Sequence, residues 1–299
     1  MIQIGVDFGG TKIEAAALNA AGDFVARVRA RNPGSYDAAI EAVCALVSEV
    51  ESIAREPGTV GVGVPGSISP TSGIMRNANS AWLNSRNFKD DLGAALGRPI
   101  RMANDANCLA LSEVVDGAAR DSKVAFAVIL GTGCGGGLVV NGHLVVGAHG
   151  IAGEWGHVPL PRSDKEVEQP VCWCGQVGCI ETWVSGSGLQ RDYGATHGKS
   201  IASEEIISLM RRGDPRACAT FQRYIDRLAR ALSILCNIVD PDTIVFGGGL
   251  SNVAEVYSQL PAVIRSYIFS DAWDASLVPA RWGDSSGVRG AARLWMSPQ

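Results

Sequence analysis

The chain has 299 residues, of which 46% are hydrophobic and 19% charged. This length allows two domains with separate cores, and the composition is typical of a globular protein. The formal net charge of −4, without a basic stripe, argues against nucleic acid as a partner. The first residues do not form a signal peptide, and the longest apolar run, residues 124–130, is too short to cross a bilayer. We therefore expect a cytoplasmic protein without membrane contact.

In chain order, the first third of the sequence predicts strands that alternate with helices. Residues 2–31 read as three strands joined by two glycine-containing turns. Residues 37–55 carry apolar side chains at helical spacing, and residues 59–66 form a short buried strand. Another strand precedes a helix expected over residues 106–115. This alternation indicates an α/β protein.

The order of strand, glycine turn and strand returns in residues 124–147, which predicts two related halves. Helices are expected over residues 215–238 and 253–268. The segment that begins at Gly283 predicts a final helix with an Asp/Ser cap.

These elements predict mixed sheets flanked by helices, in two lobes with a cleft between them. We expect an N-terminal lobe over residues 1–118 and a C-terminal lobe over residues 119–284. The last helix, about residues 285–299, is expected to pack back on the N-terminal lobe.

One histidine and three cysteines lie close together in the second half: His157, Cys172, Cys174 and Cys179. Cys₃His is the ligand set of a closed tetrahedral zinc site, which has no open position for catalysis. We expect a structural zinc ion here; the alternative is a zinc knuckle that only holds a loop together. The other five cysteines are scattered and are expected to be free thiols.

Acidic residues bracket this metal segment. Glu154 lies three residues before His157, and Glu181 lies two residues after Cys179. A metal bond fixes the imidazole, so that its second ring nitrogen points in a defined direction. Two carboxylates and an imidazole held together in this way can hydrogen-bond several hydroxyl groups of a sugar.

Three glycine-rich turns combine small and hydroxylic residues, which suits the binding of phosphate oxygens by backbone N–H groups. Each alone could be an ordinary hairpin, but together they favour a bound nucleotide. Asp7 is the natural carboxylate for a hydrated Mg²⁺. The spacing of Gly131 to Gly136 matches a dinucleotide fingerprint, but a strand follows instead of the required helix. The turns contribute Gly9, Gly10, Thr11, Lys12, Gly131, Thr132, Gly133, Gly248 and Gly249.

Asp105 stands where a strand gives way to a helix. Two interpretations remain open for it. It can cap the helix, which is the commonest use of Asp at such a position. It can also be a general base that takes a proton from an alcohol during phosphoryl transfer.

Together these motifs resemble those of the ROK family of bacterial sugar kinases and repressors, which have the actin-like ATPase (ribonuclease H-like) fold. The resemblance extends over nearly the whole chain. It rests on DFGGTK at Asp7, GVPG at Gly63, NDAN at Asn104, GTGCGGG at Gly131, GEWGH at Gly153, CWCGQVGCIE at Cys172, FGGGLS at Phe246 and GDSSGVRGAA at Gly283.

The resemblance implies that Asp105 is the catalytic base and that the cysteine-histidine set binds zinc. It implies phosphate-binding roles for the first two glycine turns and places Gly248 and Gly249 near the adenosine of ATP. It also implies a homodimer. The sugar contacts that it implies are Asn104, Asp105, Glu154, His157 and Glu181.

The loop over residues 66–84 resembles that of fructokinases of the manno(fructo)kinase type, and it adds Asn79 as a hexose contact. We therefore expect phosphorylation of D-fructose, and also of D-mannose, at the 6-hydroxyl. The alternatives are a glucokinase, an N-acetylhexosamine kinase or a non-catalytic sugar sensor. DFGG begins at residue 7, so we expect no DNA-binding domain ahead of it.

Overall fold

The structure is a computed structural model that describes residues 1–78, 80–161 and 169–296. The chain divides into two compact units. Unit 1 comprises Met1–Ser122, Gly137–Ala152 and Arg281–Gln299, and unit 2 comprises Lys123–Gly136 and Gly153–Ala280. Residues 137–152 therefore belong to unit 1, whereas the sequence predicted them to be part of the C-terminal lobe.

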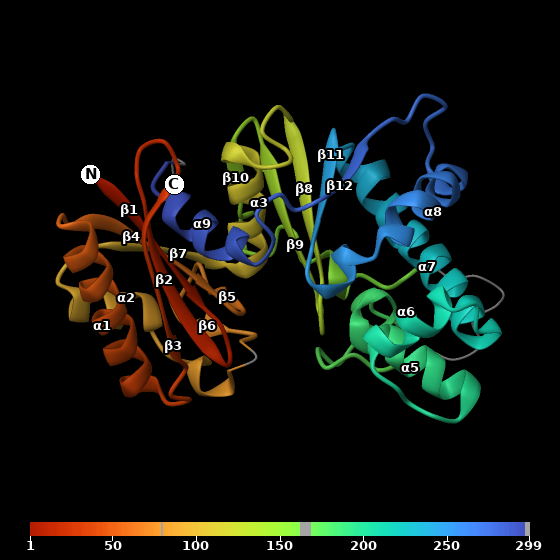
Figure 1. Cartoon of the computed structure of the whole chain (residues 1–299), viewed down its shortest axis with the longest axis horizontal. Helices are drawn as coiled ribbons and strands as arrows, with labels where there is room; N and C mark the ends of the chain where they lie inside the picture. Colours follow the sequence, from red (N-terminus) through yellow and green to blue (C-terminus); the bar gives the residue numbers. More distant parts are fainter. Residues whose placement is uncertain (79, 162–168, 297–299) are drawn as a thin grey trace. The chain divides into compact units, whose positions relative to one another are not determined.

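The sheet of unit 1 has the strand order β3-β2-β1-β4-β7 (Figure 1). The first three strands pair antiparallel, and β4 and β7 are parallel to β1. A two-stranded sheet of β5 (Ser67–Ile68) and β6 (Met75–Arg76) follows β4. The main strands are β1 (Ile2–Phe8), β2 (Lys12–Leu18), β3 (Phe24–Arg31), β4 (Gly58–Val64) and β7 (Ile100–Asn104).

Helices cover both faces of this sheet. The helices α1 (Tyr36–Ala54) and α2 (Phe88–Leu96) pack on one face, over a core that includes Val43, Val47 and Phe88. On the other face α9 (Ser286–Arg293) lies on β1 and β4, with α3 (Asp105–Asp116) beside it (Figure 1).

Glycines in two strands permit this close approach of α9. A Cβ at Gly5 would lie 1.9 Å from the Val288 carbonyl oxygen, and one at Gly61 would lie 1.9 Å from that of Ala291. No larger residue fits at either position.

The second five-stranded sheet repeats the order of the first, as β10-β9-β8-β11-β12. This match confirms the internal repeat expected from the sequence. The strands are β8 (Val124–Leu130), β9 (Cys134–Val140), β10 (His143–Val145), β11 (Thr243–Gly247) and β12 (Ser276–Pro279).

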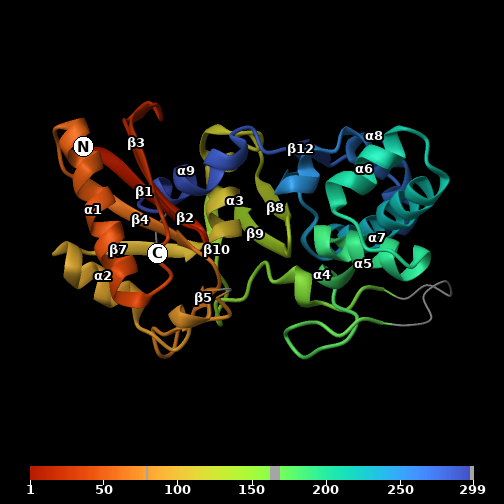
Figure 2. The same cartoon turned by 60° about the horizontal axis from the view of Figure 1, so that its bottom comes forward.

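The helices of unit 2 form a group in which α7 contacts α5, α6 and α8 (Figure 2). They are α4 (Glu181–Val184), α5 (Gly186–His197), α6 (Ser203–Arg211), α7 (Pro215–Val239) and α8 (Ala254–Ile264). None of the helices in the described ranges has the length and apolar character that a membrane crossing needs.

Two details differ from the sequence-based expectations. The helix expected over residues 253–268 ends at Ile264, three residues after Pro261, which cannot donate a backbone hydrogen bond. A 3₁₀ turn, Arg265–Tyr267, continues from it. The side chain of Ser285 makes no cap hydrogen bond at the start of α9, so the expected Asp/Ser cap is wrong.

Candidate functional site

In unit 1, Asp7 lies near the end of β1, and the first glycine turn follows directly. Gly10, Thr11 and Lys12 are exposed. Buried Asn32 supports the turn from behind, because its Nδ2 donates to the Gly9 carbonyl at 2.8 Å. The turn is therefore held in shape and open to a ligand.

Negative charge is concentrated around Asp7. Burial and, to a smaller extent, the charges of Asp105 and Glu14 together raise the pKa of its carboxyl to about 6, against the lowering effect of Lys12 and Arg29. A cation bound beside Asp7 would relieve this repulsion. Carboxylate oxygens also suit Mg²⁺, directly or through water, so the donor chemistry fits that ion.

Asn104 is the last residue of β7 and the N-cap of α3. Its Oδ1 accepts the N–H of Asn107 at 2.7 Å. This contact satisfies one of the free N–H groups at the helix start. Asn104 therefore makes the helix cap that was one of the two interpretations of Asp105. The cap uses Oδ1 of Asn104 and does not use its Nδ2.

Asp105 is the first residue of α3 and is exposed to solvent. Its Oδ1 accepts the N–H of Ala106 at 2.8 Å. Although the residue as a whole is exposed, the protein atoms around its carboxylate displace water and raise the pKa of this group, while the N–H of Ala106 opposes this effect. A raised pKa makes a carboxylate a better proton acceptor.

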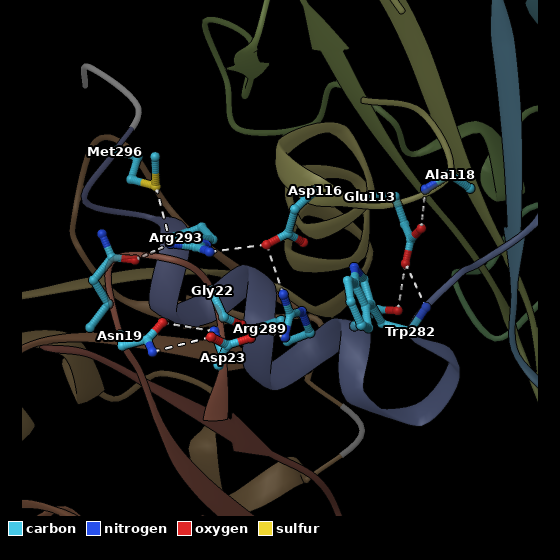
Figure 3. Close-up of polar contacts among 12 residues, drawn as sticks. Asn19, Gly22, Asp23, Glu113, Asp116, Ala118, Trp282, Arg289, Arg293 and Met296 are labelled. Atoms are coloured by element: carbon cyan, nitrogen blue, oxygen red, sulfur yellow. Dashed lines mark hydrogen bonds and ion pairs between the residues drawn. The ribbon is translucent and has the colours of Figure 1, made fainter. Parts of the chain in front are cut away.

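The helix that carries Asp105 is anchored to the C-terminal segment by two acidic residues (Figure 3). Asp116 pairs with Arg289 at 2.7 Å and with Arg293 at 3.0 Å. Glu113 is fully buried. It accepts hydrogen bonds from the backbone N–H groups of Ala118, Arg281 and Trp282 and from the Ser286 hydroxyl.

Replacing Glu113 with alanine should lower the free energy of unfolding by about 3 kcal/mol or more, because several buried donors lose their acceptor. Glu113→Gln keeps a side-chain acceptor and should cost less. Urea unfolding of both variants checks this. A Glu113→Ala protein with wild-type stability would show that water replaces the carboxylate.

Unit 2 holds a cavity of about 720 Å³ beside the second glycine turn. Gly131, Thr132 and Gly249 are among the residues that line it. Gly248 packs against the turn, since a Cβ there would lie 2.8 Å from the Gly131 nitrogen. The cavity thus brings together the second and third of the three glycine runs that the sequence assigned to one nucleotide.

The sequence motifs did not predict the other residues that line this cavity. They come from the start of α5, from α6 and from the turn after β11, and no motif marked them. The polar ones are Ser187, Gln190, Ser203, Glu204, Ser208, Arg211, Arg212 and Asn252.

Three segments of unit 2 meet at the second glycine turn. The indole N–H of Trp155 donates to the Gly135 carbonyl at 2.9 Å. The Cys134 N–H donates to Oε2 of Glu181 at 2.9 Å. The segment of Glu154 and His157 and the segment of Glu181 are thus both attached to this turn.

The four expected metal ligands converge. The donor atoms of His157, Cys172, Cys174 and Cys179 lie within 4.8 Å of one another. Sγ of Cys174 and Cys179 are 3.7 Å apart, and Sγ of Cys172 is 3.7 Å from Nδ1 of His157. With zinc–sulfur bonds of about 2.3 Å, two ligands of a tetrahedral ion lie about 3.8 Å apart. The donor set and its spacing therefore fit zinc, with Nε2 of His157 left free.

The loop over residues 66–84, which the sequence predicts to contact the hexose, is described only in part, and Asn79 lies outside the described residues. Ser67 and Ile68 of this loop line a cavity of about 150 Å³ in unit 1, together with Asn104. The loop and Asn104 thus share one cavity.

The chain is similar to known proteins both in sequence and in structure. A model of the ROK family matches residues 3–297. The chain is 39% identical over 299 residues to an N-acetyl-D-glucosamine kinase of Salmonella paratyphi C, covering 98% of this chain and 99% of that protein.

Two solved structures are also similar. A ROK hexokinase from Thermus thermophilus has a TM-score of 0.88 and 30% identity, covering 98% of this chain and 97% of the other. A ROK family glucokinase from Streptomyces griseus, in complex with glucose and AMPPNP, has a TM-score of 0.79 and 26% identity, covering 98% and 99%. These similarities, with the repeated strand order, confirm the actin-like ATPase fold.

Proposed function

The chain belongs to the ROK family, and from this premise we propose that it phosphorylates N-acetyl-D-glucosamine at the 6-hydroxyl with ATP. It is a sugar kinase that acts on a hexose. The observation that carries the choice of hexose is its 39% identity, over nearly its whole length, to an N-acetyl-D-glucosamine kinase.

D-Fructose remains the second candidate. It rests on the resemblance of the loop over residues 66–84 to the fructokinase type. The curated relative compared above is an N-acetyl-D-glucosamine kinase and not a fructokinase, so the loop does not identify the substrate by itself.

In this proposal Asp105 is the general base. Its carboxylate accepts the proton of the 6-hydroxyl as the oxygen attacks the γ-phosphorus of ATP, and ADP leaves. Asn104 caps the helix that carries this base, which fixes the carboxylate at the helix start. Its free Nδ2 can donate to a sugar hydroxyl.

The sugar ligands of unit 2 are Glu154, Glu181 and Nε2 of His157. The two carboxylates accept hydrogen bonds from sugar hydroxyls, and the imidazole of His157 hydrogen-bonds a third hydroxyl. Zinc bound by His157 and the three cysteines would hold these ligands in position without taking part in the chemistry.

The nucleotide lies in the cavity of about 720 Å³, with Gly248 and Gly249 near the adenosine. Backbone N–H groups of Gly131, Thr132 and Gly133 bind phosphate oxygens. Gly9, Gly10, Thr11 and Lys12 are proposed to bind phosphate from unit 1. Asp7 would hold Mg²⁺ through water, and the ion would there neutralise charge on the phosphates.

The test is ADP release from MgATP with N-acetylglucosamine, fructose, mannose and glucose compared side by side. We expect the highest kcat/KM with N-acetylglucosamine. A pocket that pairs the acetamido group rejects hexoses without it by a large factor, since its polar groups then stay unpaired. Highest kcat/KM with fructose would select the second candidate, and no turnover with any hexose would favour a sugar sensor.

A further inference from the structure

Trp173 lies between two of the expected metal ligands, Cys172 and Cys174. Its side chain is 61% exposed, although a tryptophan ordinarily buries most of its large apolar surface. Its neighbours Val171 and Val177 are also exposed, at 74% and 49%. The local packing therefore does not explain a tryptophan at this position.

The polar contact of Trp173 is specific. Its indole N–H donates to Oε1 of Glu181 at 2.6 Å. Its ring also meets the ring of His157 edge to face, with 5.0 Å between the ring centroids. One exposed side chain thus touches two of the proposed sugar ligands.

Glu181 extends this contact to the glycine turn. Its second oxygen accepts the Cys134 N–H at 2.9 Å. A Cβ at Gly133 would lie 2.7 Å from that oxygen, so the turn and the carboxylate are in close contact. Hydrogen bonds thus run from the metal loop through Trp173 and Glu181 to the phosphate-binding turn.

We propose that Trp173 is a positioning residue that orients Glu181 for the sugar and holds the turn at Gly133 for the nucleotide. The proposal rests on the proposed function for the role of Glu181. A hydrogen bond to a charged group both fixes its direction and stabilises its charge. Without the indole donor, Oε1 of Glu181 is free to rotate away, and the bond to Cys134 loosens with it.

The decisive variant is Trp173→Phe, which keeps an aromatic ring beside His157 and removes only the N–H donor. The matched control is Val171→Ala, which changes an exposed side chain beside Cys172 without removing a side-chain hydrogen bond. Three quantities are measured for each protein: the metal content, the Kd of MgADP without sugar by calorimetry, and the kinetic constants for the hexose that the wild type turns over.

Trp173→Phe should retain the metal and raise both the Kd of MgADP and the KM of the hexose by about five- to tenfold, with a smaller change in kcat. Val171→Ala should match the wild type. Unchanged constants in a metal-loaded Trp173→Phe protein would overturn the proposal. Loss of the metal would also overturn it, because Trp173 would then act only on the loop.

The calorimetric measurement does not depend on which hexose is the substrate. A wild type that binds MgADP but turns over a hexose other than N-acetylglucosamine would change the proposed substrate and leave the role of Trp173 testable. A wild type that binds no MgADP would overturn the proposed function, and the role of Trp173 with it.

Discussion

Replacing Asp105 with asparagine should lower kcat by about 10²–10⁴-fold and change hexose binding much less. The amide cannot accept the proton of the attacking hydroxyl. Because Asn104 makes the N-cap of α3, the variant should keep its helix and its fold. Steady-state kinetics with a thermal melt of the same sample check this.

The matched control for Asp105 is Asp37→Asn. Asp37 is an exposed acid in the first turn of α1 and has no proposed role. The Asp37→Asn variant should keep the wild-type kcat. This control separates base catalysis by Asp105 from the general effect of an acid at a helix start. A near-normal kcat in Asp105→Asn would mean that Asp105 only serves the helix.

The pH dependence of kcat/KM is a second test of the Asp105 carboxylate. The pKa of Asp105 is raised above its ordinary value of 3.8. A base must be deprotonated to act, so kcat/KM should fall as the pH falls through this raised pKa. The acid limb should therefore begin at a higher pH than an ordinary aspartate would give, and it should change in Asp105→Asn.

Replacing Cys174 with serine should remove the metal, lower the melting temperature and weaken hexose binding by at least about tenfold. Zinc bound to the four donors would hold His157 and, through the same loop, Glu181. Metal analysis, a thermal melt and the KM of the hexose measure the three effects.

Cys44→Ser is the control for the loss of a thiol, since Cys44 lies in α1 of unit 1 and is not one of the four expected metal ligands. It should keep the metal and the wild-type KM. A Cys174→Ser protein that is folded, metal-free and fully active would contradict the structural role of the ion.

The sequence predicted the elements that depend on local pattern. The first two glycine turns lie between paired strands, as their context indicated, and the repeat of strand order follows from the repeated motif. The strand after Gly133 excludes a dinucleotide fingerprint, as expected. The convergence of the four expected metal ligands could be predicted because a Cys₃His set within 23 residues leaves few other uses for these side chains.

The sequence did not predict contacts that join distant segments. Glu113 lies 168 residues from Arg281 and binds its N–H, and no local pattern connects them. The residues of α6 that line the cavity beside the second glycine turn have an ordinary helical pattern. Asp105 and Asn104 are both good caps, so only the backbone geometry decides that Asn104 makes the cap.

The central claim is that Asp105 directs the γ-phosphoryl group of ATP to the 6-hydroxyl of a hexose. Phosphorus and carbon NMR of the product formed from MgATP and N-acetylglucosamine tests it most directly. The account predicts a phosphomonoester coupled to carbon 6 with the wild type, and a trace of it at most with Asp105→Asn. Phosphate on another carbon, free phosphate alone, or an undiminished yield with Asp105→Asn would contradict it.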